Sequence, residues 1–214
     1  MRQLFRLTPL ERKNWEDNYI AAEIKGIHLS PVHESIEKIV AVINRIILPR
    51  YCTAVPVKFL VDDNMEKNAF ALPYSTVVIN RGFIELVQPT WDELAFVIAH
   101  ESAHIFRLHT VDRPVIDLFH RGLFVDPVNR AAFTVATRRF VSCFVEYDAD
   151  ESAARYLRHC GFDPTAGQRL ISKLQQNGVG FWNNLIQGTH PSTSSRINRL
   201  RRLTPYLDHK QYAN

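Results

Sequence analysis

The chain has little of what builds a disulfide scaffold or a cysteine metal site. Its 214 residues include three cysteines, Cys52, Cys143 and Cys160. Their number is odd and no C-x-x-C pair occurs, which argues against both kinds of structure. One disulfide with a leftover thiol stays open, but buried free thiols are the simpler account.

Long hydrophobic runs are also missing. No apolar run approaches the ~20 residues of a membrane helix. The first residues lead directly into the charged segment Glu11-Arg12-Lys13, without the apolar core of a secretory signal. The sequence as written therefore predicts a cytoplasmic protein. A periplasmic or membrane-associated location is the alternative if a targeting segment has been removed.

Charge of one sign is only mildly in excess. The formal net charge is +4, with 46% hydrophobic and 22% charged residues, which suits one globular domain with a sizeable core. Positive charge concentrates at Arg196, Arg199, Arg201 and Arg202, which predicts a solvated helix face rather than contact with an anionic lipid or nucleic acid. No nucleic-acid-binding motif is present, so we expect no nucleic-acid partner, while membrane association stays open.

Apolar periodicity divides the chain into helices around a small sheet. Thr90 and Glu93 predict a capping box, with Thr90 as N-cap. The β-branched residues 55–61 and 76–80 predict strands. Start and stop signals predict further helices from Thr8-Pro9, from Ser30-Pro31, over residues 128–159 up to Cys160-Gly161, from Pro164 to about Gln176, and from Pro191. An α+β fold dominated by helices follows, without internal repeats.

The helix after Thr90 contains the most informative pattern, His100-Glu101-Ser102-Ala103-His104. A four-residue step leaves two side chains on one helix face, so both imidazoles can reach one metal ion while Glu101 projects beside it. This H-E-x-x-H arrangement is typical of zinc peptidases. The alternative is an amphipathic core helix with two solvent-facing histidines.

A catalytic zinc ion needs a third protein ligand and keeps one position open for water. His109 is a poor candidate, because it projects about 140° away from His104 on the same helix. Glu146 and Asp150 are better placed, four residues apart in a later helix. One of them can bind the metal while the other accepts the second N–H of a ligand histidine.

Four segments then resemble one family in both sequence and order. They are Asn68-Ala69-Phe70-Ala71-Leu72-Pro73 with Val77-Val78-Ile79 and Gly82, the pattern at residues 100–104, Glu146-x-Asp148-Ala149-Asp150, and Thr189-His190-Pro191-Ser192-Thr193-x-x-Arg196. Together they resemble the HtpX-like zinc metallopeptidases, which include the CaaX prenyl endopeptidases and the BepA-type proteases. The resemblance runs from about Asn68 to Leu200.

The resemblance implies a role for particular residues. The zinc ligands would be His100, His104 and Glu146, as in a gluzincin with one Zn²⁺ per chain, and Glu101 would be the general base. His190 would stabilise the oxyanion, Asp150 would orient a ligand histidine, and Arg196 would order the site. Substrate would bind along Asn68, Ala69, Phe70 and Ala71.

The implied fold is a zincin-like metallopeptidase domain with a small sheet packed on the active-site helix. We expect residues 1–214 to form one domain, with N-terminal helices over residues 1–50 and a catalytic core over residues 51–204. The sequence departs from the family pattern at Tyr74-Ser75, where a Gly-rich turn is usual, and at Asp148, where Glu is common. Transmembrane helices and a following helical-repeat domain are missing.

The expected function is zinc-dependent endopeptidase activity on protein or peptide substrates, in protein quality control. Strand addition at residues 68–72 or 76–80 could hold the substrate with little sequence selectivity. The alternative is a latent or non-catalytic, chaperone-like zinc protein. Its metal site would be closed, with His190 as a fourth ligand.

Overall fold

The computed structural model describes residue 18 and residues 28–50, 56–71, 75–88, 90–107, 127–177 and 192–208. For residues 127–142 and Asp208 it describes the backbone alone. The elements, in chain order, are β1 (Leu29–Ser30), α2 (Glu34–Ile46), the short 3-10 helix η2 (Leu48–Arg50), β2 (Lys58–Asp62), β3 (Ala69–Ala71), β4 (Thr76–Asn80), α3 (Arg81–Val87), α4 (Trp91–Phe106), α6 (Pro127–Cys160), α7 (Ala166–Gln176) and α8 (Thr193–Asp208).

The strands form one mixed sheet in the order β1-β2-β4-β3. β2 runs parallel to β4, with Lys58 opposite Thr76, while β1 and β3 pair antiparallel to their neighbours. β4 is buried along its whole length and paired on both sides. It therefore has no free edge for a peptide, and the expectation of strand addition at residues 76–80 is wrong. β3 lies at the edge of the sheet.

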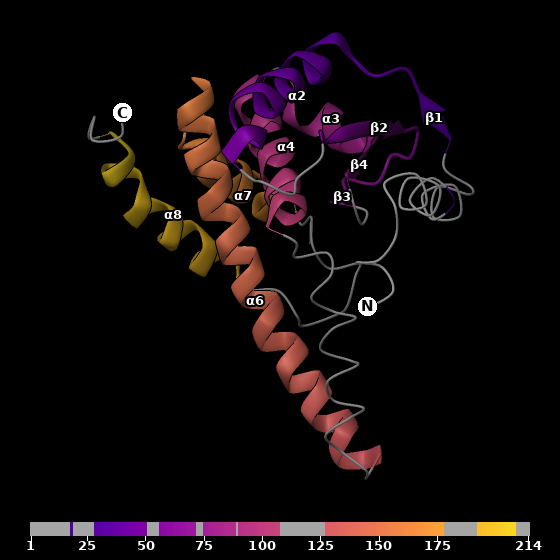
Figure 1. The fold of residues 1–214 in the computed structure, drawn as a ribbon, viewed down its shortest axis with the longest axis vertical. Coiled ribbons are helices and arrows are strands. Elements are labelled where there is room, and N and C mark those ends of the chain that lie inside the picture. Colours follow the sequence, from indigo (N-terminus) through magenta and orange to yellow (C-terminus); the bar gives the residue numbers. More distant parts are fainter. Residues whose placement is uncertain are drawn as a thin grey trace.

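Helix α4 is the centre of the fold (Figure 1). All of its residues are buried except Trp91, Asp92 and His104. The sheet, α2, α3, α6 and α7 all contact it. His100 is buried and the His104 side chain is only 12% exposed, so the alternative of a helix with two solvent-facing histidines is wrong. The fold is α+β and dominated by helices, as predicted.

The long helix α6 crosses α4 and continues beyond the other helices at its N-terminal end (Figure 1). Its predicted extent over residues 128–159 is confirmed to within one residue at each end. Gly161 ends it with φ of 83°, a backbone conformation that residues with a Cβ rarely adopt. Cys143 and Cys160 on α6 form no disulfide, as expected, but they are half-buried rather than buried.

Two predicted helix starts need correction. The helix expected from Ser30-Pro31 begins at Glu34, because Leu29 and Ser30 pair with β2 and His33 caps the helix through its Nδ1 atom. Thr90 does precede α4, but its side chain makes no capping bond. Its backbone N–H donates to Val87, so Glu93 does not close a capping box.

Several predictions fall outside the described residues, namely those on Thr8-Pro9, Cys52, Tyr74, His109 and His190. Among the described helices, none combines the length and apolar character that crossing a bilayer requires.

Candidate metal centre

Three potential metal ligands meet where α6 crosses α4. His100 and His104 lie on consecutive turns of α4, and Glu146 reaches them from α6. The two Nε2 atoms are 3.1 Å apart. Each lies 3.5 Å from a Glu146 carboxylate oxygen, His100 from Oε2 and His104 from Oε1. His100 and Glu146 are buried, and the His104 side chain is 12% exposed.

These separations fit a tetrahedral ion. Metal–ligand bonds of about 2.0–2.1 Å at tetrahedral angles place neighbouring ligand atoms about 3.3 Å apart. The three side chains each offer one atom, and these atoms lie within 4.8 Å of one another. Two imidazoles and a carboxylate are also a donor set that zinc favours. The residues therefore fit a zinc ion without rearrangement of the backbone.

Asp150 and Arg196 support the ligands from behind. Nδ1 of His100 lies 3.0 Å from Oδ1 of Asp150, which leaves Nε2 facing His104 and Glu146. Arg196, from α8, donates from Nε to Oδ2 of Asp150 at 2.7 Å and from Nη2 to Oδ1 at 2.6 Å. Its Nη2 also lies 3.8 Å from Glu146 Oε2. Arg196 is buried, so it does not belong to the solvated basic face, which Arg199, Arg201 and Arg202 do form.

The buried charges shift one another's pKa values strongly. Burial opposes the ionisation of Glu146 and Asp150, but contacts with His100 and Arg196 outweigh it and hold the pKa of both carboxyls well below the usual range. Burial lowers the pKa of His100, whereas hydrogen bonds to Asp150 and Glu146 raise it to a net value of about 9. In the metal-free site the two ionised carboxylates are thus balanced by Arg196 and a protonated His100.

Glu101 lies in the same buried space. It is 2% exposed, and its Oε1 atom makes no hydrogen bond within the described part of the chain. Its carboxylate accepts a backbone hydrogen bond from Ala71 of β3. Burial, the largest cause, raises the pKa of Glu101 to about 8, although the charge of His100 opposes the rise. An unpartnered buried carboxylate oxygen is the kind of atom that a reaction can use.

The predicted substrate-binding residues lie beside this carboxylate. Ala69 to Ala71 form the edge strand β3, and Asn68 directly precedes it. The contact between Ala71 and Glu101 is one that the sequence did not reveal, because a backbone N–H leaves no sequence signal.

A buried H-E-x-x-H helix completed by a carboxylate from a second helix defines the class of metal-dependent peptidases. The chain belongs to that class through Peptidase family M48, whose model matches residues 32–204. A search of curated proteins gave no match. The chain is therefore a metallopeptidase, a hydrolase that acts on protein or peptide substrates.

Proposed function

We propose that the protein is a zinc-dependent endopeptidase that works in protein quality control, with His100, His104 and Glu146 as ligands and Glu101 as general base. One observation carries this proposal. Two imidazole Nε2 atoms lie 3.1 Å apart, and each lies 3.5 Å from one of the two carboxylate oxygens of Glu146. They share a buried space with the Oε1 atom of Glu101, which has no hydrogen-bond partner in the described structure.

When bound there, a zinc ion would polarise the scissile carbonyl and acidify the attacking water. Glu101 then accepts the proton of that water at Oε1 and delivers it to the leaving amine. Burial raises the pKa of Glu101, which favours the carboxyl form that holds the proton between the two steps. Glu101 can do this because it is not itself a ligand.

The supporting residues have positional roles in this proposal. Asp150 holds His100 in the tautomer whose Nε2 lone pair is available, and Arg196 fixes Asp150 with two hydrogen bonds. His190 is proposed as the donor to the developing oxyanion, from the family resemblance alone.

Substrate is proposed to bind along the edge of β3 with which no other described strand pairs. The backbone N–H of Asn80 donates to the carbonyl of Asn68. In an antiparallel pair the bonded positions alternate, so the backbone groups of Ala69 and Ala71 point away from β4. The influence of the Ala71 backbone on the pKa of Glu101 supports an arrangement in which this outward edge runs past the proposed base. An extended peptide pairing there would lie beside Glu101 and be held mainly by its own backbone.

The test combines metal content with casein cleavage. We expect about one zinc ion per chain, cleavage that a chelator abolishes, and recovery when zinc is returned. Glu101→Gln should keep the metal and lower kcat by about 10²- to 10⁴-fold, because it removes the proton acceptor without removing a ligand.

Chelator-sensitive cleavage that persists in Glu101→Gln would overturn the proposed role of Glu101. Wild-type protein that holds zinc but cleaves nothing would instead favour the latent or chaperone-like alternative. Protein that binds no metal would contradict both.

A further inference from the structure

Glu93 is a buried carboxylate that neither helix capping nor the proposed chemistry explains. It lies on α4 with its side chain only 4% exposed. It precedes His100 by seven residues, which is nearly two whole turns, so the two side chains project from the same face of the helix. A buried charge is unfavourable unless it is paired, so its partners define what it does.

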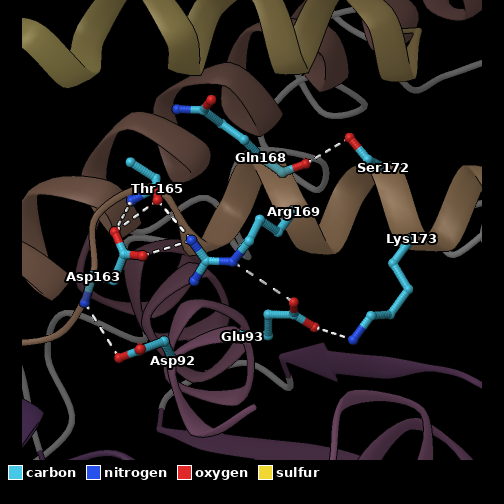
Figure 2. A network of polar contacts seen from close by, with 8 residues as sticks. All are labelled: Asp92, Glu93, Asp163, Thr165, Gln168, Arg169, Ser172 and Lys173. Carbon is cyan, nitrogen blue, oxygen red and sulfur yellow. Dashed lines mark hydrogen bonds and ion pairs between the residues drawn. The ribbon is translucent and has the colours of Figure 1, made fainter.

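Those partners belong to α7 (Figure 2). Lys173 Nζ lies 2.6 Å from Glu93 Oε2, and Arg169 Nε lies 3.9 Å from Oε1. Both cations are partly exposed, at 31% and 43% of their side chains, so the buried end of the pair is the carboxylate on the metal-binding helix.

A second contact connects the same region to α6. Asp92, next to Glu93, accepts a hydrogen bond at 3.2 Å from the backbone N–H of Asp163, in the turn between α6 and α7. Asp163 in turn accepts from Arg169 Nη1 at 2.5 Å and from the N–H of Thr165 at 2.8 Å (Figure 2). The turn therefore joins α4 to the end of the helix that carries Glu146.

α7 also packs against Phe96, whose ring lies beside His100. A Cβ atom on Gly167 would lie 2.3 Å from the ring of Phe96, so only glycine allows this approach. The Phe96 ring in turn lies against His100, with 6.2 Å between the ring centroids. A shift of α7 along α4 would therefore displace the Phe96 ring and, through it, the His100 side chain.

We propose that Glu93 and Lys173 are positioning residues for the metal centre. Together they fix the register of α4 against α7 and the preceding α6, and so set the distances from His100 and His104 to Glu146. A small slide of α4 would take the buried Glu93 away from Lys173 and leave an unpaired charge. Metal–ligand distances tolerate errors of only about 0.2 Å. A restraint on the position of α4 therefore acts directly on the distances between the proposed ligands.

The inference rests on the proposed metal site but can be tested without peptide hydrolysis. The variants are Glu93→Gln, Lys173→Met and Arg169→Gln, with Lys173→Arg as the conservative rescue. Zinc affinity of the metal-free protein is measured by competition with a chelating indicator, and the geometry of the site by the visible absorption spectrum of the Co²⁺-loaded protein.

We expect Glu93→Gln and Lys173→Met to bind zinc about tenfold more weakly and to alter the Co²⁺ spectrum, as changes beside metal ligands commonly do. Lys173→Arg should stay within about twofold of wild type, because it keeps the charge. Lys173→Met leaves the buried Glu93 with Arg169 alone, whereas Glu93→Gln removes the buried charge itself, so Glu93→Gln is expected to fold even if Lys173→Met does not. Glu93→Gln then decides the question, and unchanged zinc affinity and spectrum in that variant would overturn the inference.

The matched control is Ile43→Val, which removes one methyl group from a fully buried site on α2. The ion pairs of Glu93 in the described structure come from α7 instead. Unchanged zinc affinity and spectrum in Lys173→Met would overturn the inference. So would an equal loss of affinity in Ile43→Val at an equal fall in unfolding temperature. If the wild-type protein binds no zinc, the proposed function fails instead.

Discussion

At the scale of single residues, the ion pair between Arg196 and Asp150 places two opposite charges in the buried interior. Both side chains are 3% exposed and joined by two hydrogen bonds. Burial opposes the charge of Arg196, yet Asp150 and Glu146 raise the pKa of its guanidinium above the usual value. The arginine therefore stays charged and balances the carboxylates behind the metal ligands.

Arg196→Met should lower the free energy of unfolding by about 3–5 kcal/mol, because it leaves Asp150 buried without its partner. The matched control is Arg199→Met on the same helix, which breaks an ion pair with Glu151 whose arginine is 51% exposed. Its effect should stay below about 1 kcal/mol. Urea unfolding of both variants measures the difference, and equal effects would contradict the role assigned to burial.

At the scale of elements, the contact between α4 and α7 depends on a glycine. Alanine at position 167 would gain about 1 kcal/mol in helix propensity. It would also place a Cβ atom 2.3 Å from the Phe96 ring, and such overpacking costs about 1–3 kcal/mol. The overlap is severe and the ring is buried, so the steric cost is expected to exceed the gain.

Gly167→Ala should therefore be destabilising by urea unfolding. The same substitution in a Phe96→Leu background should be less harmful or even stabilising, since the smaller side chain makes room. An equal loss in both backgrounds would show that the ring contact does not limit this position.

The start of α7 predicts a pH effect on stability. Burial acts to raise the pKa of Asp163, but hydrogen bonds from Thr165 and Arg169 outweigh it and lower the pKa below its ordinary value of 3.8. A depressed pKa in the folded state adds stability above the unfolded pKa, and this stability is lost as the pH falls through the folded value.

Asp163→Asn keeps the acceptor oxygen but removes the charge. It should be destabilising at pH 7 by on the order of 0.5 kcal/mol, because the Asp163 side chain is 36% exposed and its charge is screened by solvent. The difference from wild type should shrink as the pH is lowered from about 4 towards 2. Thermal unfolding across this range tests the sign, and a difference that grows in acid would contradict it.

At the scale of the whole molecule, metal binding and stability should be linked. The ligands come from two helices, α4 and α6, that meet only in the folded protein. An ion bound to the folded state alone stabilises it by an amount that grows with free metal concentration, about 4 kcal/mol at a thousand times Kd.

Zinc added to the metal-free protein should therefore raise the unfolding temperature by about 10 °C at such an excess, since each kcal/mol shifts a chain of this size by about 2–4 °C. Glu101→Gln should show the same rise, because Glu101 is not a ligand, whereas His104→Ala should lose most of it. Calorimetry with and without zinc gives the result. A rise that survives in His104→Ala would place the ion elsewhere.

The expected organisation as one domain over residues 1–214 stays a prediction.

Local patterns in the sequence were enough to predict the fold class, most helix bounds and the pair of neighbouring histidines on α4 that could hold a metal. Helical periodicity and end signals act over a few residues, so α6 and its end at Gly161 could be predicted closely. The H-E-x-x-H spacing is equally local, because a four-residue step fixes a shared helix face. Only the family resemblance chose Glu146 rather than Asp150 as the third ligand.

Tertiary structure decided the rest, because the deciding contacts join residues far apart in the chain. Glu93 has the spacing of a capping residue, yet the packing of α7 buries it and pairs it with Lys173, eighty residues on. Arg196 belongs to a basic run in the sequence, and only the crossing of α8 over α6 turns it inward to Asp150. The position of β3 at the edge of the described sheet, beside Glu101, depends on strand order, and strand order follows from how the whole chain packs.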